Sequence, residues 1–587
     1  MITIIIQVDI MFCEILFEEE EDYLKDIIHK EMHKKLGVKQ DGYMFSPAYK
    51  SGFWDGITDF YNKDSETFPT GLLPQVDKIL GELQNNVGFT YSIEDIRPDK
   101  FLKSEDIDKE IKVLKDGEEV TLRDYQRESV VSIIQNQLGI INASTNSGKS
   151  LTASGLIQQI LPYLESDERI AFFTHSKSIF TQNAKAIGES LGIEVGMYGS
   201  GKKDIRKVTF VMIPTMVSAI TKDPESGIKL TAKERRCKKI AKEIAPKFTK
   251  GFNQRSFFFN YIKNFKPSTK TGKVLKDELE DILDTCGTDK QLVMKLKGYE
   301  AQYQKILEKK NGKVLKKKQE AQEFLDSIAV MIVDEAHHTS SDSWYKVLTS
   351  CPNAQYRMAL TGSIDKKNKL LWQRMKALFG EVTMKVSNEQ MIKRGISAKP
   401  TITMFPILAP TDIQNKDYMT AYELGIAENE YRNLLIAKLV EKMYNRGKGI
   451  LVIVSRIEHG EHIDELLDQL EVPHEFIYGD TEDDQREARI QSMREGGLKV
   501  LISSTILDEG VDISGINTLI MGAGGKSLRQ TLQRVGRGLR KKQIGENTLD
   551  VFDFIDYSNK YLKRHSEERM RIYENEGFEV KEIPLPK

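Results

Sequence analysis

The chain is poor in cysteine. Its 587 residues contain only Cys13, Cys237, Cys286 and Cys351, and no two of them form a CxxC pair. The sequence therefore suggests neither a zinc site nor a disulfide framework. Free thiols are typical of a reducing compartment, so we expect a cytoplasmic protein.

Long apolar runs are also missing. No run approaches the roughly 18 to 20 residues that a membrane-spanning helix needs, and we expect no membrane partner. The N-terminal stretch MITIIIQVDIMFCEILFEEEED is apolar, but Asp9 interrupts it, acids follow it and no basic region precedes it. A strand is therefore a better interpretation than a signal peptide.

The chain has no large excess of charge of either sign. A net charge of −1 gives no global indication of a polyanionic partner, although a neutral total can conceal opposite local charges. Residues 222–325 hold 26 Lys and Arg against 14 Asp and Glu, a net +12, which leaves −13 for the rest. Their composition favours helix, so we predict a charged helical insertion.

Two series of short β-branched runs alternate with amphipathic stretches, which predicts parallel sheets of the α/β class. The runs are LGIINA, RIAFFTH, VTFVMIP, AVMIVDEA and YRMALTG in the first series, and GILVIVS, HEFIYG, KVLISST, INTLIMGAG and LDVFDFID in the second. We predict a small α/β domain over 1–116, a first sheet domain over 117–395 with the insertion 222–325, and a second over 396–587.

The stretch INASTNSGKS, residues 141–150, resembles a phosphate-binding loop between a strand and a helix. Backbone N–H groups from Asn146 through Gly148 and the start of the helix would surround a β-phosphate. Lys149 would reach the β and γ oxygens, and the Ser150 hydroxyl would ligate Mg²⁺. Asn146 occupies a position where many such loops have glycine, but Asn tolerates left-handed backbone.

An alternative for this stretch is an ordinary strand-to-helix turn capped by Ser147. A second Gly-Lys-Ser sequence, GAGGKS at 522–527, has Ile520 where the loop requires Gly or Ala, and the pattern after it differs. We expect that second sequence not to bind a triphosphate.

Asp334 and Glu335 end the apolar run AVMIVDEAHH, at the strand end where open α/β sheets bind ligands. Asp334 would hold the Mg²⁺ shell, and Glu335 would act as general base toward the attacking water. The alternative is an acidic helix N-terminus, which the helix dipole favours. His337 and His338 have no further His or Cys cluster near them in the sequence, which argues against a zinc site.

Together these motifs resemble those of the superfamily-two helicases. Asp334-Glu335-Ala336-His337 resembles their motif II, and 143–150 resembles motif I, in which alanine commonly opens the motif. The resemblance implies two RecA-like motor domains, with ATP and Mg²⁺ as cofactors, and unwinding of nucleic acid as the work of hydrolysis. ATP would close a cleft between the domains and hydrolysis would open it.

Further elements follow in the family's order. LRDYQ, residues 122–126, resembles the adenine-recognition element, in which Arg123 and Gln126 would contact the nucleotide. Leu360-Thr361-Gly362-Ser363 resembles motif III. By this resemblance His337, Thr361 and Ser363 would couple the ATP site to the DNA tract.

The second domain carries resemblances to motifs V and VI. STILDEGVDI, 504–513, resembles motif V and would place Gly510 and Asp512 at the nucleotide. QRVGRGLR, 533–540, resembles motif VI, in which Gln533, Arg537 and Arg540 would face the γ-phosphate and stabilise transition-state charge. The alternative for 533–540 is a basic helix face.

Four positions match the family's phosphate contacts along the DNA strand: Ser176, Thr215, Arg456 and Thr505. Each could instead be a helix cap or a turn residue. Within the insertion, RSFFFNYIKNFK (255–266) interleaves aromatic and basic residues, which fits either a base-stacking platform or a packed helix face.

The segment GFWDGITDFY…FPTGLL (52–73), before the motor motifs, is similar to the N-terminal domain of phage UvsW-type helicases, a branch close to type III restriction motors. This resemblance implies a substrate-recognition domain over 1–116 and a DNA helicase acting on forks, Holliday junctions, D-loops or R-loops. The expected partners are branched or single-stranded DNA, RNA in hybrids, and single-strand-binding or recombination proteins. We expect a monomer in the host cytoplasm.

Three alternatives remain. The motor motifs alone do not separate RNA from DNA helicases, and a restriction-type translocase shares them. Pro98-Asp99 with Glu110-Ile111-Lys112 nominally matches a nuclease pattern, although KVLKDGEEVTL favours a simple hairpin. A non-hydrolysing, ATP-gated annealing protein is disfavoured because Lys149, Glu335 and Arg540 are all present.

Overall fold

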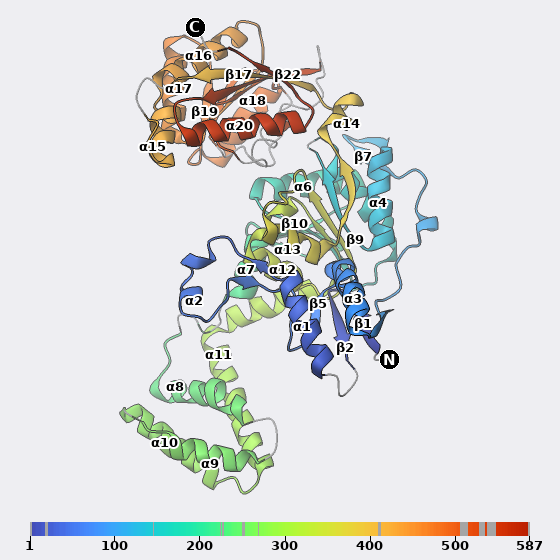
Figure 1. Cartoon of the computed structure of the whole chain (residues 1–587), viewed down its shortest axis with the longest axis vertical. Helices are drawn as coiled ribbons and strands as arrows, with labels where there is room; N and C mark the ends of the chain where they lie inside the picture. Colours follow the sequence, from blue (N-terminus) through green and yellow to red (C-terminus); the bar gives the residue numbers. More distant parts are fainter. Residues whose placement is uncertain are drawn as a thin grey trace. The chain divides into compact units, whose positions relative to one another are not determined.

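The computed structural model describes residues 3–17, 22–144, 146–222, 225, 228–248, 253–267, 269–408, 413–504, 515–526, 535–536 and 547–584. The chain forms two compact units, Met1–Ile213 with Ser327–Lys587, and Pro214–Asp326 (Figure 1). Across the described ranges, no helix is both long and apolar enough to span a bilayer.

A four-stranded sheet of order β5-β2-β1-β6 opens the chain. Its elements are β1 (Thr3–Val8), β2 (Phe12–Leu16), β5 (Thr67–Pro69), β6 (Thr90–Asp95) and the helices α1 (Asp22–Leu36) and α3 (Leu73–Val87). Alternate residues of β1 are buried in one cluster with both helices, as the period of a half-buried strand requires. The predicted N-terminal strand is confirmed.

This sheet packs directly on helix α13 (Lys369–Phe379), whose Ala377 belongs to the same core cluster. Gly71 marks the closest approach, because a Cβ there would lie 2.1 Å from the carbonyl oxygen of Lys376. Smaller elements follow from the same region: β3 (Val38–Lys39), β4 (Ile57–Thr58), α2 (Pro47–Lys50), and the hairpin β7 (Lys112–Lys115) with β8 (Glu118–Thr121). That hairpin agrees with the interpretation of KVLKDGEEVTL as simple turn structure.

The first large sheet has eight strands in the order β12-β11-β13-β10-β14-β15-β9-β16. Its strands are β9 (Leu138–Ala143), β10 (Arg169–Thr174), β11 (Gly196–Gly199), β12 (Lys202–Asp204), β13 (Val208–Met212), β14 (Ile328–Val333), β15 (Tyr356–Thr361) and β16 (Val382–Val386). Every pairing is parallel except that of β11 with β12. The helices are α4 (Asp124–Asn136), α5 (Lys149–Ile160), α6 (Lys177–Leu191), α12 (Asp342–Thr349), α13 and α14 (Asn388–Lys393).

The second sheet is entirely parallel, in the order β19-β20-β18-β21-β22-β17-β23. Its strands are β17 (Lys399–Ile407), β18 (Ile450–Ile453), β19 (Glu475–Ile477), β20 (Val500–Ser503), β21 (Thr518–Met521), β22 (Thr548–Asp556) and β23 (Glu579–Glu582). The accompanying helices are α15 (Tyr418–Tyr422), α16 (Glu430–Tyr444), α17 (Ile457–Gln469), α18 (Asp483–Arg494) and α20 (Lys560–Asn575).

Alternate residues of this sheet enter two separate cores. One core combines the sheet with α16 and α17, and the other combines it with α18 and α20. A sheet buried on both faces explains why its strands are continuous apolar runs. The predicted fold class, two tandem RecA-like parallel sheets with a small α/β domain and a helical insertion, is confirmed.

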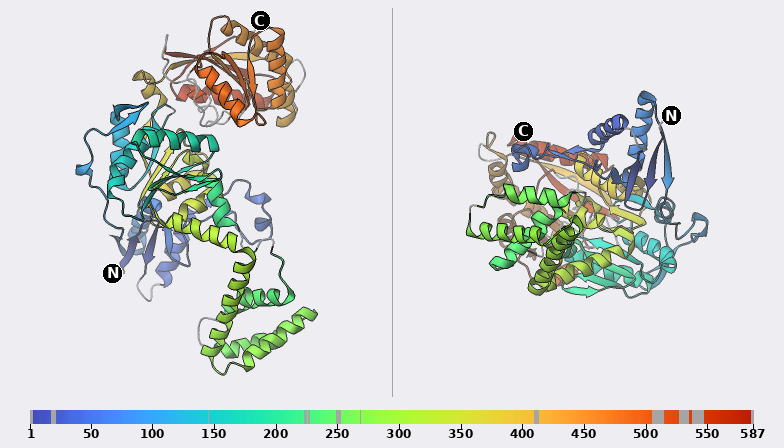
Figure 2. Two further views of the ribbon diagram at one scale, coloured as in Figure 1. Left: turned by 180° about the vertical axis from the view of Figure 1, so that it is seen from behind. Right: turned by 90° about the horizontal axis from the view of Figure 1, so that it is seen from below.

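The helical unit, drawn in green in Figure 2, joins the chain after β13 and before β14. Its helices are α7 (Ile213–Thr221), which starts at its boundary, then α8 (Ala232–Lys239), α9 (Gln254–Asn264), α10 (Lys270–Asp284) and α11 (Asp289–Asp326). Helix α11 is interrupted at Asn311, whose φ of −144° is not helical. The helical unit has a hydrophobic core of its own, which includes Phe258, Ile262, Leu279 and Leu292.

Candidate functional site

The loop between β9 and α5 has the backbone of an anion cradle. Asn146 has a φ of 71° and Gly148 a φ of 80°, two left-handed residues on either side of Ser147. The left-handed conformation that Asn tolerates is thus the one found here. Gly148 is the N-cap of α5 and provides no side-chain cap, so the first-turn N–H groups are left for another acceptor.

The side chains around this loop fit a polyphosphate. In the part of the chain that the structure describes, Asn146 Nδ2 and the Ser147 hydroxyl are buried without a hydrogen-bond partner. The Ser147-capped turn is therefore wrong, since that hydroxyl caps nothing. Lys149 Nζ lies 3.4 Å from the Ala143 carbonyl oxygen, over the end of β9, where it can exchange this weak contact for a phosphate oxygen.

Gln126 supports the loop from behind. Its side chain is 1% exposed, and its Nε2 donates to the carbonyl oxygen of Ser147 at 2.9 Å while its Oε1 accepts from the Arg123 backbone N–H at 2.9 Å. The Tyr125 hydroxyl donates to the same Ser147 carbonyl oxygen at 2.8 Å. The adenine contact predicted for Arg123 and Gln126 stays a prediction, and it requires Gln126 to exchange bonds that it makes here to protein.

Asp334 and Glu335 follow β14, two strands from the phosphate loop. Asp334 Oδ2 accepts from the side-chain amide of Asn183 on α6 at 3.0 Å, and its Oδ1 accepts from the Glu335 N–H at 2.9 Å. The sequence does not single out Asn183, which lies 151 residues before Asp334. Its position on the helix after β10 is the only feature of the sequence that points to this contact. Ser150 is the second residue of α5, so the predicted Mg²⁺ ligands Ser150 and Asp334 both lie at the carboxyl edge of one sheet.

The three coupling candidates are connected to Glu335. The Glu335 carboxylate lies 3.2 Å from His337 Nδ1, which in turn lies 3.3 Å from the Thr361 hydroxyl. Thr361 Oγ1 donates to the Ser363 carbonyl oxygen at 2.9 Å. A polar chain therefore runs from the predicted base to the loop after β15.

A ring cluster that sequence reasoning missed lies beside this chain. His338 stacks on His175 with centroids 4.2 Å apart and contacts Trp344 at 5.2 Å. His337 lies 4.5 Å from His338. The cluster fixes the segment after Glu335 by packing, which explains how a short 3₁₀ turn at 336–340 can hold a carboxylate in place.

The predicted DNA contacts are scattered. Ser176 is the N-cap of α6 and accepts from the Ile179 N–H at 3.4 Å, so the cap alternative is found there. Arg456 is the N-cap of α17, with its guanidinium 5.1 Å from the Tyr422 ring centroid. Thr215 lies in α7, and Thr505 lies outside the described residues.

The candidates from motifs V and VI also lie outside the described residues; they are Gly510, Asp512, Gln533, Arg537 and Arg540. The second Gly-Lys-Ser stretch is described up to Lys526, and arginines donate to two of its carbonyl oxygens. Arg569 donates to the Gly525 carbonyl oxygen at 2.6 Å, and Arg432 to that of Gly522 at 3.4 Å.

Those arginines are paired with buried acids. Arg569 bonds both oxygens of Asp553 at 2.9 Å, and the Tyr573 hydroxyl donates to Asp553 Oδ2 at 2.7 Å. Arg432 donates to Asp556 at 2.5 Å, and burial nonetheless raises the pKa of that carboxyl. This stretch therefore uses its carbonyl groups as acceptors for protein cations, an arrangement opposite to an anion cradle.

Two protein-family models match the chain, and several known helicases are similar to it. Residues 119–366 match the family described as "Type III restriction enzyme, res subunit", and residues 432–542 match the "Helicase conserved C-terminal domain". The ATP-dependent DNA helicase UvsW of Enterobacteria phage T4 is 21% identical over 577 residues, 93% of this chain and 94% of that one. A DNA 3'-5' translocase of Sulfurisphaera tokodaii is 23% identical over 81% of this chain and 92% of its own length. The crystal structure of T4 UvsW aligns with 99% of each chain at a TM-score of 0.41 and 17% identity.

The two family matches and the similar relatives identify the chain as an ATP-dependent helicase, and it resembles the superfamily-two helicases. Within that superfamily it is similar over nearly its whole length to T4 UvsW, as the N-terminal resemblance predicts.

Proposed function

We propose that the protein is an ATP-dependent helicase or translocase of branched DNA, acting on forks, Holliday junctions, D-loops or R-loops in recombination, replication restart and repair. The observation that carries the proposal is the extent of the similarity to a phage DNA helicase. Because 93% of the chain is aligned, the alignment extends into residues 1–118, which neither motor family covers. A shared N-terminal region favours a shared substrate class.

We assign the ATP chemistry to the residues at the edge of the first sheet. The N–H groups of 146–150 would bind the β-phosphate, and Lys149 would neutralise the transferred phosphoryl oxygens. Ser150 and Asp334 would hold Mg²⁺, which supplies charge stabilisation when bound. Glu335, oriented by His337, would accept the proton of the attacking water. Gln533, Arg537, Arg540, Gly510 and Asp512 keep the predicted roles of motifs V and VI.

The remaining assignments concern the substrate. Ser176, Thr215, Arg456 and Thr505 would contact phosphates without distinguishing bases. Residues 1–116 would recognise the branch, 117–395 and 396–587 would be the motor domains, and single-strand-binding or recombination proteins would be partners. We propose that the protein works as a monomer in the cytoplasm of a phage host.

One experiment tests the substrate directly. ATPase rates measured side by side with fork DNA, single-stranded DNA, duplex DNA and structured RNA should be highest with fork DNA. Unwinding of a labelled fork should require ATP. A larger stimulation by RNA than by any DNA would overturn the proposal.

RNA is the second candidate, because a putative ATP-dependent RNA helicase of Acanthamoeba polyphaga mimivirus is 24% identical over 44% of this chain. That alignment spans 266 residues, whereas the alignment with the phage DNA helicase covers 93% of the chain. The same ATPase comparison decides between the two candidates.

A further inference from the structure

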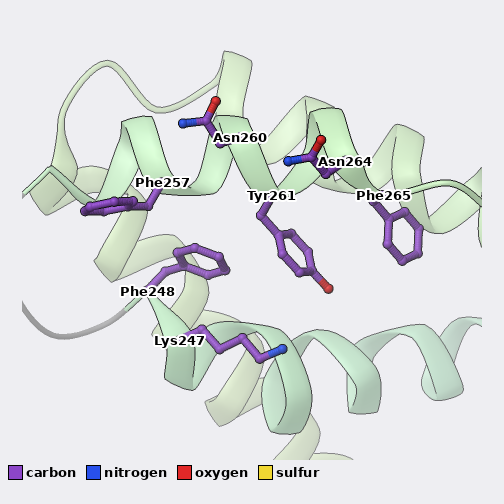
Figure 3. Close-up of a pocket in the computed structure, with 7 residues that line it drawn as sticks. All are labelled: Lys247, Phe248, Phe257, Asn260, Tyr261, Asn264 and Phe265. Atoms are coloured by element: carbon purple, nitrogen blue, oxygen red, sulfur yellow. The ribbon is translucent and has the colours of Figure 1, made fainter.

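The helical insertion contains a pocket of about 500 Å³, inside the range of roughly 300 to 1,000 Å³ typical of small-ligand sites. Phe257, Tyr261 and Phe265 line it from α9 and its C-cap at intervals of four residues (Figure 3). Phe248 and Lys247 line the opposite side, from the turn after α8.

The rings of the pocket are held in fixed positions. On the same helix, Phe258 is fully buried and Ile262 is 4% exposed, so α9 is anchored in the core of the insertion. Tyr261 and Phe265 stack at 6.1 Å with an interplanar angle of 26°, and Phe248 meets Tyr261 at 64°. Phe257 is 57% exposed. The pocket therefore presents flat aromatic faces to solvent on a rigid support.

Cations surround these rings. Lys247 Nζ lies 5.6 Å from the Tyr261 centroid, and Lys239 Nζ lies 5.8 Å from that of Phe265. Among the described residues, no carboxylate lies within ion-pair distance of Lys239, Lys247 or Lys263. Residues 232–266 contain 11 Lys and Arg against two acids.

Burial and the Glu243 carboxylate raise the pKa of Tyr261, and a phenol is neutral near pH 7 at its ordinary pKa as well. The pocket thus combines uncharged stacking surfaces with ammonium groups that have no ion-pair partner among the described residues. Single-stranded nucleic-acid sites have this combination, since bases stack on aromatic faces while lysines neutralise the backbone. A protein partner would need an acidic segment to pair with those lysines. The flat ring faces of the pocket do not fit such a segment.

We propose that this pocket binds one or two unpaired nucleotides of single-stranded DNA, with a base stacked against Tyr261 or Phe257 and a phosphate beside Lys247. Binding is insensitive to sequence, because every base has a stacking face. The choice of DNA rests on the proposed function, whereas the pocket is argued from the insertion alone. The insertion would then retain the displaced strand independently of nucleotide hydrolysis.

The test uses the full-length protein, without ATP, and a 12-nucleotide oligothymidylate that contains 5-iododeoxyuridine. Irradiation should cross-link the base to a stacked ring in the tryptic peptide 256–263, SFFFNYIK, identified by mass spectrometry. Tyr261→Ala should weaken binding of the oligonucleotide by roughly 5-fold or more, the effect of removing one base–aromatic stack. Tyr261→Phe, which keeps the ring, should bind normally.

Phe257 and Phe259 provide a matched pair. Both lie on α9 with similar exposure, 57% and 53%, but only Phe257 lines the pocket. Phe257→Ala should reduce cross-linking at least 5-fold, and Phe259→Ala should leave it unchanged. Because both rings are exposed, neither substitution removes core packing, and a folding defect cannot imitate the result.

Equal effects of the two substitutions, cross-links confined to residues outside 214–326, or stronger cross-linking to a 5-iodouridine RNA than to DNA would each overturn the proposal. Its failure differs from that of the proposed function. Normal stimulation of the ATPase by fork DNA without a cross-link in 256–263 rejects the pocket alone. A cross-link there without stimulation rejects the motor proposal and leaves the pocket.

Discussion

The two Gly-Lys-Ser sequences of this chain have opposite surroundings. In the loop ending at Ser150, Asn146 and Gly148 are left-handed, and among the described residues Asn146 Nδ2 and the Ser147 hydroxyl are buried without a hydrogen-bond partner. In the stretch that begins at Gly522, the carbonyl oxygens of Gly522 and Gly525 accept hydrogen bonds from arginines. The first is arranged to receive an anion, and the second is held in place by cations of the protein.

A short motif therefore acquires its chemistry from the groups around it. Two sheets of similar topology place a glycine-rich turn after a buried strand, yet one turn carries unsatisfied donors and the other satisfied acceptors. Activity should therefore depend on the first turn and stability on the second. Four measurements test that division, and the one with the greatest expected change is described first.

Asp553→Ala should lower the free energy of unfolding by about 3 to 5 kcal/mol, because it leaves the buried Arg569 without its carboxylate. Urea denaturation followed by circular dichroism would measure the loss. Replacing both partners, Asp553→Leu with Arg569→Met, should recover at least half of it. A loss under 1 kcal/mol for the single variant would show that the ion pair does not hold the second turn.

Lys149→Ala should lower the fork-stimulated ATPase rate by roughly 10²- to 10³-fold, the usual effect of losing one charge-stabilising group. Its melting temperature should change little, since Lys149 makes only a 3.4 Å contact with a carbonyl oxygen. Lys526→Ala is the matched control in the second turn and should keep activity within about 2-fold. Equal losses in the two variants would contradict the division.

Asn183→Ala should reduce the ATPase rate by roughly 10- to 100-fold and raise the Mg²⁺ concentration needed for half-maximal rate. The reason is that the Asn183 side-chain amide donates to Asp334 at 3.0 Å and so orients that carboxylate. Asn183→Asp, which places a negative charge beside Asp334, should be worse than Asn183→Ala. An unchanged Mg²⁺ dependence would reduce Asn183 to a packing residue.

His459 should make the second sheet domain sensitive to acid. Burial lowers the pKa of His459 to about 3, so between pH 6.5 and 3 the unfolded chain binds a proton that the folded chain does not. Stability then falls as the pH falls through 6.5, by about 1 kcal/mol at pH 5.5 relative to pH 7. Urea midpoints at the two pH values should differ less for His459→Gln than for the unchanged protein.

Much of the fold follows from the sequence, because buried parallel strands are continuous apolar runs. The stretch AVMIVDEA (329–336) overlaps β14, which is buried at all six of its positions, and the excess of lysine before it marks the helical unit. In the insertion, the helical spacing of Phe258 and Ile262 indicates a packed face, which is confirmed. The pocket formed by the exposed rings of the same segment could not be predicted, because spacing along a helix does not tell which groups lie opposite that helix.

The site was predictable as a set of motifs but not as a network. The left-handed position of Asn146 follows from its residue type. The bond from Asn183 to Asp334 and the chain from Glu335 to Thr361 do not, because they join side chains far apart in sequence through sheet order. The hydrogen bonds of Gln126 to the loop were not predicted either. The resemblance implies that its side-chain amide contacts the nucleotide, whereas in the structure this amide bonds to protein backbone.

Glu335 adopts a φ of 49°, which is unfavourable for a residue with a Cβ. Such a conformation raises the energy of the folded state by on the order of 1 kcal/mol, and glycine would relieve it. Glu335→Gly is thus expected to make a more stable protein that lacks the proposed general base. A population selected for thermal resistance alone would tend to lose this carboxylate, so a directed-evolution experiment must select for turnover at every round.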